Sequence, residues 1–258
     1  MSIPLRDRRT VTAVSSGVSR QTLNGAVGWA VDVLGVAVTA RRSLAGGLSA
    51  GMVALETRGG DFALRWWEEP GRWPAACLAR QRAALDALVG TDLPVPRCVA
   101  SDDTVPAAVT TWLPGEIDLD PVDPQRWITA LADTLVAIHR VPPPPMLPPS
   151  DAPADPKLDP DLDWLDDPGL EAEARALIAT PSTGPPALLH GDYQHFNVVW
   201  RNGHLSGVID WPLGGAGNRG LDVGHCRLNL AVLFGVDAAM TFLDRYEAAA
   251  GQPGLPVR

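Results

Sequence analysis

A group of polar side chains stands between apolar runs in the stretch LLHGDYQHFNVVW, residues 188–200. An apolar strand that ends in HGD would present Asp192 at a tight turn, where it faces a cleft. Asn197 follows, before the strand-forming run VVW, the turn RNG and the run GVID. This order predicts a hairpin that brings Asp210 back beside Asn197. The spacing therefore predicts three oxygen-bearing side chains at one site.

These oxygens suit a hard cation such as Mg²⁺, which keeps several waters and takes one or two protein carboxylates together with substrate phosphates. Asn197 and Asp210 are therefore candidate Mg²⁺ ligands. Asp192 lies upstream and points in a different direction, which leaves it free to act as a base. An Asp that accepts a hydroxyl proton beside an Asn and a second Asp that hold metal is the arrangement of phosphoryl transfer.

Two other interpretations of the same residues are open. The structural one is that Asp192, Asn197 and Asp210 only cap turns. The chemical one is a zinc hydrolase, but it would require His190 and Asp192 to converge, whereas their apolar neighbours demand a single strand. It would also leave the β-rich N-terminal part of the chain unexplained. The side chains of such a cluster would be His190, Asp192, His195, Asp210, Asp222 and His225.

The elements that position this loop begin with three β-forming runs, VAVTARRSL, MVALETR and FALRWW. They are joined by AGGLSAG and by the turn RGGD, which predicts an antiparallel meander. A helix is expected over residues 74–89, with Gly90 just beyond its end. The run PVPRCVASDDTVPAAVTTWLPG then predicts two further short strands.

The second half of the chain is predicted to be mostly helical. Asp123 is a plausible N-cap before Pro124 for a helix that runs to about residue 140, and further helices are expected over residues 168–179 and 241–250. The run VPPPPMLPPSDAPADPKLDP should be an extended surface linker, because it cannot propagate either regular structure.

Four segments follow from this order of elements. Residues 1–22 should form a loosely ordered leader, before a short helix that Asn24 caps and Gly35 ends. Residues 23–115 should form a β-rich N-lobe that contains the glycine loop, the meander and a helix. Residues 116–258 should form a helical C-lobe that carries the polar loop and includes the proline-rich linker 141–160.

The composition narrows the function classes. The 258 residues are 46% hydrophobic, which is enough for a sizeable core. The net charge of −9 argues against nucleic-acid binding and favours cationic partners. Three cysteines without a CxxC pair fit a reducing cytoplasm. The apolar stretch 26–40 is too short for a spanning helix and is interrupted by Asp32, so neither a membrane anchor nor an export signal is expected.

The motif HGDYQHFN, followed by IDW, closely resembles the catalytic segment of the aminoglycoside phosphotransferase family, which is related to the protein kinases. The resemblance covers residues 25–250 approximately. SLAGGLSAGMVALET looks like the nucleotide loop of that family, FALR like its third strand, and TTWLPGE like its interlobe connector. The resemblance implies an α+β, bilobal protein-kinase-like fold, with a small antiparallel β N-lobe and a mostly helical C-lobe.

The resemblance also implies roles for single residues of the catalytic segment. Asp192 would be the catalytic base, Asn197 and Asp210 would bind Mg²⁺, His190 would brace the loop, and Asp222 in GLDVGHCRLNL would support it.

On the nucleotide side, the glycine loop that contains Gly46, Gly47 and Ser49 would contact ATP. Trp112, beside the connector, is a candidate contact for the adenine. The loop is neither GxGxxG nor GxxxxGK[ST], so dinucleotide and Walker-type sites lack their motifs.

Two residues depart from the kinase pattern. Arg65 stands where kinases use a strand lysine, and Lys157, the single lysine, lies in the proline-rich linker. Arginine retains the charge and adds a bidentate fork, so nucleotide binding should survive. Gln81 stands where a Glu would pair with this basic residue and cannot neutralise it. Either the clamp on ATP is weaker, or Glu68 or Glu69 takes that role.

The expected function is Mg²⁺-dependent transfer of the ATP γ-phosphoryl group to a hydroxyl of a small molecule. An acidic surface suits a cationic acceptor such as an aminoglycoside, and the resemblance equally admits sugars, choline-like alcohols and other metabolites. The alternative is a nucleotide-binding pseudoenzyme or regulatory protein with little turnover. It is motivated by Gln81 and by the run GQPGLPVR, where the chain ends earlier than the family leads us to expect. The choice between ATP and GTP and the oligomeric state are left open.

Overall fold

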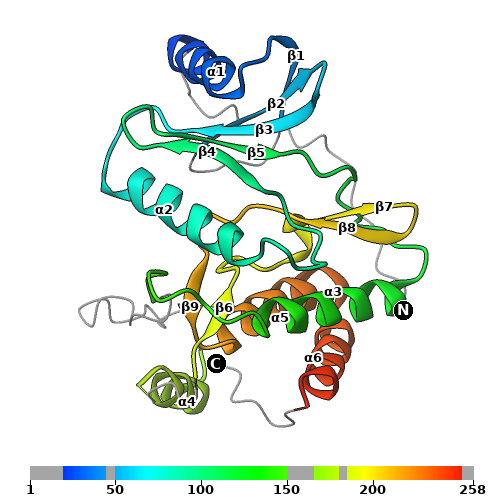
Figure 1. Cartoon of the computed structure of the whole chain (residues 1–258). Helices are drawn as coiled ribbons and strands as arrows, with labels where there is room; N and C mark the ends of the chain where they lie inside the picture. Colours follow the sequence, from blue (N-terminus) through cyan, green and yellow to red (C-terminus); the bar gives the residue numbers. More distant parts are fainter. Residues whose placement is uncertain (1–19, 45–49, 150–165, 180–184, 252–258) are drawn as a thin grey trace.

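A five-stranded antiparallel sheet lies above a mostly helical half in the computed structural model, which describes residues 20–44, 50–149, 166–179 and 185–251 (Figure 1). The β2–β3 turn is the predicted one, with Thr57 opposite Gly60. The meander is therefore confirmed, and the two later strands extend it. In sheet order the strands are β1 (Val38–Ser43), β2 (Gly51–Thr57), β3 (Gly60–Trp66), β5 (Ala107–Thr111) and β4 (Cys98–Asp102).

Helix α1 (Arg20–Leu34) covers one face of this sheet. Ala26 and Ala30 are buried against Leu55 and Leu64 of the sheet. The prediction that Asn24 starts this helix was wrong: it begins at Arg20, because no breaker precedes Asn24 and Leu23 also packs on the core. The predicted leader therefore ends before residue 20, and residues 1–19 lie outside the described part. The helix does end at Gly35, which has a φ of 63°.

Helix α2 (Arg72–Ala87) covers the opposite face of the sheet and separates it from the lower half (Figure 1). Because successive strand residues point to opposite faces, Trp66 packs toward α1 and Trp67 packs beside Cys77 and Leu78 of α2. The helix begins and ends two residues earlier than predicted. It brings Gln81 into the interior, where its exposed fraction is 5%.

The lower half is built on α3 (Pro124–His139), which packs against α6 (Val236–Ala250). Asp123 is the predicted N-cap and accepts a hydrogen bond from the backbone N–H of Arg126. The main core is shared by α3, the segment that carries the polar loop and the C-terminal helices. Its largest members include Trp127, Leu131, Leu135, Tyr193, Trp211, Leu230, Phe242 and Tyr246.

Two small hairpin-like sheets carry the polar loop. Strand β6 (Ala187–Leu189) pairs with β9 (Gly215–Gly217), and β7 (Val198–Arg201) pairs with β8 (His204–Val208). The predicted turn after β7 is confirmed, since Asn202 and Gly203 both have positive φ. The helix η1 (His195–Asn197) fills the gap between β6 and β7.

The remaining segments complete the lower half. Helix α4 (Pro168–Ala179) has the predicted bounds. The start of the proline-rich segment runs beside β9, where the N–H of Ala216 donates to the carbonyl of Pro148, and residues 150–165 lie outside the described part. Helix α5 (Gly220–Phe234) and strand β9 were not predicted. No helix within the described ranges is both long enough and apolar enough to cross a membrane.

Candidate active site

A cavity of about 460 Å³ lies between the sheet and the lower half. Its walls come from β1–β3, β5, α2, the connector after β5 and the segment that follows β8. Four of the predicted site residues line it: Arg65, Gln81, Trp112 and Asp210. The predicted phosphate-loop residues Gly46, Gly47 and Ser49 fall in residues 45–49, outside the described part of the chain.

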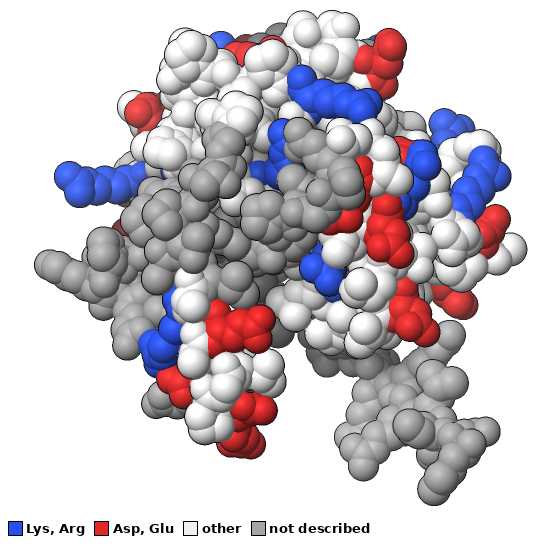
Figure 2. Space-filling view, turned by 90° about the horizontal axis from the view of Figure 1, so that it is seen from below, with Lys and Arg blue, Asp and Glu red and all other residues white. Residues whose placement is uncertain are grey.

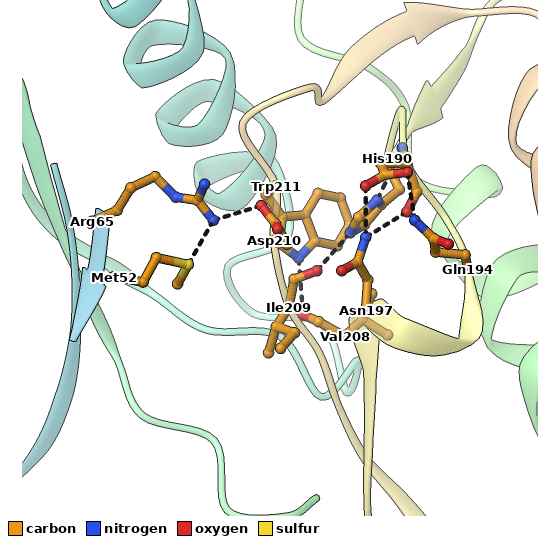
Figure 3. A network of polar contacts seen from close by, with 10 residues as sticks. Met52, Arg65, His190, Gln194, Asn197, Val208, Ile209, Asp210 and Trp211 are labelled. Carbon is orange, nitrogen blue, oxygen red and sulfur yellow. Dashed lines mark hydrogen bonds and ion pairs between the residues drawn. The ribbon is translucent and has the colours of Figure 1, made fainter. Parts of the chain in front are cut away.

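An ion pair crosses this cavity. Nη2 of Arg65, on β3, lies 2.6 Å from Oδ1 of Asp210, and the two side chains are 8% and 32% exposed (Figure 3). Asp210 has a φ of 70°, an uncommon backbone conformation that turns its carboxylate toward β3. Among the described contacts, the carboxylate partner of Arg65 is therefore Asp210. Glu68 and Glu69, which were one of the two alternatives for this role, are exposed. Gln81 lines the same cavity without a hydrogen bond to Arg65 among the described contacts.

Asp192 follows β6 in the HGD turn and is not among the residues that line this cavity. Its Oδ1 accepts a hydrogen bond from Nε2 of Gln194 at 2.9 Å, and its Oδ2 accepts one from Nδ2 of Asn197 at 2.9 Å. Nε2 of His225, on α5, lies 2.9 Å from Oδ1, in the geometry of an ion pair more than of an aligned hydrogen bond. The carboxylate is thus held from both sides.

These contacts control the protonation of Asp192. Burial alone would raise its pKa, but the contact with His225 and the hydrogen bond from Asn197 outweigh burial, so the pKa lies below its ordinary value. The same contact with Asp192 raises the pKa of His225 above its ordinary value, against the effect of burial. Asp192 is therefore ionised at neutral pH, as a proton acceptor requires.

Asn197 joins the Asp192 turn to the segment that carries Asp210. Its Nδ2 also donates to the carbonyl oxygen of Asp192, at 2.8 Å, and its own backbone oxygen accepts a hydrogen bond from the N–H of Ile209, at 2.8 Å. Ile209 directly precedes Asp210, so the predicted juxtaposition of Asn197 and Asp210 is built into the backbone. Because the amide nitrogen is used by Asp192, the amide oxygen of Asn197 is left as a ligand.

The donor set fits Mg²⁺. Among the described contacts of Asp210, Arg65 takes Oδ1 and the other oxygen has no partner. One carboxylate oxygen and one amide oxygen, with room for waters and phosphates, match the ligands that Mg²⁺ accepts. Within the described residues, no group of three or more His, Cys, Asp or Glu side chains could hold a metal. The zinc-cluster interpretation therefore finds no support.

His190 and Asp222 form the scaffold beneath the loop, and both are fully buried. Asp222, on α5, accepts hydrogen bonds from the backbone N–H groups of His190 and Gly191, at 2.7 and 2.8 Å. Nε2 of His190 donates to the carbonyl of Ile209 at 2.9 Å. His190 therefore ties the Asp192 turn to the segment that carries Asp210.

The scaffold extends to residues that sequence reasoning missed. His139 of α3 lies 3.2 Å from Oδ2 of Asp222 and 2.6 Å from the hydroxyl of Tyr246 on α6. Burial would raise the pKa of Asp222, but the hydrogen bonds and charge of His139 lower it below its ordinary value. His225 was weighed only as a zinc ligand. Its spacing of three residues from Asp222 would have placed it on the same helical face, had α5 been predicted.

His195 lies in an apolar environment, unlike the other polar side chains of the loop. It is fully buried, its ring lies 4.2 Å from that of Phe196, and neither ring nitrogen has a hydrogen-bond partner among the described residues. Burial lowers its pKa below the ordinary value. It packs as an uncharged ring in the loop and takes no part in the contacts of Asp192.

A sheet above a helical half, with an Asp, an Asn and a second Asp where they meet, is the arrangement of kinase-like phosphotransferases. The model of the phosphotransferase enzyme family (APH) matches residues 41–258, and the chain belongs to this family. The predicted family and the bilobal kinase-like fold are thereby confirmed.

Solved structures share this fold. The macrolide 2'-phosphotransferase MphH from Brachybacterium faecium is 20% identical, over 90% of this chain and 86% of that chain, with a TM-score of 0.63. An aminoglycoside-3'-phosphotransferase of type VIII is 20% identical, over 92% and 96%, with a TM-score of 0.64. The streptomycin–ATP–APH(2")-IIa ternary complex is 17% identical, over 90% and 85%, with a TM-score of 0.61. No curated protein matches the sequence.

Proposed function

We propose that this protein transfers the γ-phosphoryl group of ATP to a hydroxyl of a small molecule, in a Mg²⁺-dependent reaction. One observation carries the proposal: Asn197 donates a hydrogen bond to the carboxylate of Asp192. The backbone of Asn197 also bonds to Ile209, directly before Asp210, which lines the cavity. One carboxylate is ionised and held toward the loop, while the other faces Arg65 across the cavity. A base on one side and a phosphate-binding cation on the other are what phosphoryl transfer needs.

Each residue of the site has a separate role in the proposed reaction. The cavity takes the nucleotide, with Trp112 beside the base and Arg65 beside the phosphates. Asp192 accepts the proton of the acceptor hydroxyl as its oxygen bonds to the γ-phosphorus. The bond from that phosphorus to the β-γ bridging oxygen breaks, and ADP leaves. Catalysis is by positioning and charge rather than by a covalent enzyme intermediate.

Asn197 and Asp210 would hold Mg²⁺. When bound, the cation neutralises the phosphate oxygens and orients the transferring group. His190 and Asp222 keep these two ligands in register with Asp192, because they tie the HGD turn to Ile209 and to α5.

The acceptor class is supported by charge and by the relatives. The chain carries a net charge of −9, and on the face seen from below the described acidic and basic side chains are interspersed (Figure 2). The solved structures of the same fold include enzymes named for macrolides and aminoglycosides. We therefore place the acceptor among hydroxyl-bearing small molecules, with cationic amino sugars first. The three cysteines are unpaired, which supports a cytoplasmic location.

The alternative, a nucleotide-binding protein with little turnover, is favoured by one observation. Arg65 is neutralised by Asp210 rather than by a carboxylate on α2, where Gln81 stands. A nucleotide must then compete with Asp210 for Arg65, which would weaken the clamp. This reading predicts measurable ATP binding without acceptor-stimulated ADP release.

The test is Mg²⁺-dependent ADP release by the purified protein with a panel of aminoglycosides, macrolides, sugars and amino alcohols. We expect release that an acceptor stimulates and that Asp192→Ala abolishes, while the affinity of the variant for ATP stays within a few-fold. Unchanged turnover in Asp192→Ala would overturn the mechanism. ATP binding without release across the panel would favour the alternative.

A further inference from the structure

Asp192 is held by three side chains, and one of them comes from outside its loop. Gln194 and Asn197 belong to the same turn and move with Asp192. His225 lies on α5, in the second turn of the helix, and reaches the carboxylate from a separate element. Among the described contacts, His225 is therefore the one side chain from outside the loop that fixes the direction of this carboxylate.

The three contacts are unevenly divided between the two oxygens. An ionised carboxylate offers about four lone-pair positions, two on each oxygen. Oδ1 faces both Gln194 and His225, each at 2.9 Å, while Oδ2 faces only Nδ2 of Asn197 among the described contacts, at 2.9 Å. Oδ2 is thus the oxygen with a position left for the proton of an acceptor.

We propose that His225 is a positioning residue for phosphoryl transfer, which fixes Oδ1 of Asp192 so that Oδ2 faces the acceptor hydroxyl. This inference rests on the proposed role of Asp192 as the base. Without His225, the carboxylate could rotate about its Cβ–Cγ bond and present an oxygen already occupied by loop donors. A misplacement of about 1 Å at such a group can reduce the rate about 100-fold.

Helix α5 is suited to this task because it is anchored beside the contact. Asp222, one turn before His225, is fully buried and accepts the backbone N–H groups of His190 and Gly191. The same helix therefore fixes the turn through Asp222 and the direction of the carboxylate through His225. The side chain of His225 is 39% exposed, so solvent also reaches it.

The experiment compares His225→Leu with His225→Gln, whose amide nitrogen can contact Oδ1 as the imidazole nitrogen does. His204→Gln is the matched control, since His204 is exposed on β8 and contacts Arg126. Turnover is measured as ADP release with the panel acceptors and, in parallel, with water as the acceptor. We expect kcat to fall about 10- to 100-fold in the Leu variant, with the KM for MgATP unchanged, and to be largely retained in the Gln variant.

Asp192→Asn separates this inference from the proposed function. If Asp192→Asn keeps full activity, the base assignment fails and the inference falls with it. If Asp192→Asn is inactive but His225→Leu has the wild-type kcat, only the inference is overturned. Equal losses of kcat in the Leu and Gln variants, with equal drops in melting temperature, would also overturn it, because they would indicate a structural role.

A second readout does not depend on turnover. The imidazole of His225 is followed by NMR titration in the wild type and in Asp192→Asn, with His225→Gln to assign its signal among the five histidines. The contact predicts that the pKa of His225 falls when Asp192 loses its charge. An unchanged titration would overturn the contact.

Discussion

At the scale of single residues, Asp210 has one cationic partner in the structure and a second in the proposed function. Without ligand, Arg65 lies 2.6 Å from one of its oxygens, and Mg²⁺ would bind the carboxylate when the nucleotide is present. A contact of this kind could not be predicted from the sequence, because 145 positions separate the two residues and neither is unusual for its strand or turn. Asp192, Asn197 and Asp210 could be placed together, because one hairpin carries the last two and a short turn joins the first.

Asp210→Asn tests the metal assignment with little change of backbone, because Asn tolerates the positive φ of this position. We expect the affinity for MgATP to fall about tenfold or more, since a charged ligand is lost, while binding of Mg²⁺-free ATP changes less. Isothermal titration with and without Mg²⁺ measures both. Asp237→Asn, at an exposed position at the start of α6, is the control. An equal loss with and without Mg²⁺ would place Asp210 outside the metal site.

The contact between His225 and Asp192 also predicts a pH dependence of stability. The folded-state pKa of His225 is raised, so its contribution is complete below its ordinary value of 6.5 and is lost as the pH rises through the raised value. The pKa of Asp192 is lowered, so its contribution is present above its ordinary value of 3.8 and is lost as the pH falls through the lowered value. The pair therefore stabilises the fold most between these two ordinary values.

The measurement is the melting temperature of the wild type and of His225→Gln at about pH 5 and at about pH 9. The difference between the two proteins should be larger at the lower pH. A difference that is the same at both values, or that grows with pH, would contradict the ion pair.

At the scale of elements, the HGD turn depends on a glycine that no side chain can replace. Gly191 has a φ of 83°, and a Cβ at this position would run into the carbonyl oxygen of Leu213. Gly203 in the β7–β8 turn has a φ of 71° but open space around it. The two glycines share a backbone conformation and differ only in their surroundings, so they form a matched pair.

Gly203→Ala should cost about 1–2 kcal/mol through its backbone conformation alone, a loss of roughly 2–8 °C in melting temperature. Gly191→Ala should cost more, because Leu213 must also move. It should also abolish turnover, since the direction of Asp192 depends on this turn. Thermal melts and ADP release measure the two effects. Equal melting temperatures, or full activity in Gly191→Ala, would show that Leu213 yields without disturbing the site.

The elements themselves were largely predictable, and the exceptions have a physical reason. The meander, the β7–β8 hairpin and the capped helix α3 have local turn and cap residues that specify them. Helix α5 does not, because apolar residues occur on its exposed side as well as its buried side, so no single stripe marks it. Leu228 and Val232 are 64% and 73% exposed, whereas Leu230 between them is fully buried. For the same reason, the position of His225 beside Asp192 could not be predicted from the sequence.

At the scale of the whole molecule, the ion pair between Arg65 and Asp210 joins the sheet to the lower half across the cavity. Glu116 of the connector makes a second kind of link, through two backbone hydrogen bonds with Trp200 of β7, at 3.0 and 2.8 Å. The backbone link does not depend on a ligand. Under the proposed function, Arg65 would exchange Asp210 for phosphates when ATP binds, so it would have two successive partners.

Arg65→Met should separate these two roles. Without ligand, the melting temperature should change little, because Asp210 is about one-third exposed and water can replace its partner. With MgATP at 100 times its Kd, the wild type should gain about 2.7 kcal/mol, which corresponds to a rise of roughly 5–10 °C. The variant should lose most of this rise at the same ATP concentration, because its affinity is lower. Arg126→Met, at an exposed position on α3, should keep it. A full MgATP-induced rise in Arg65→Met would mean that Arg65 only closes the empty cavity and does not contact the phosphates.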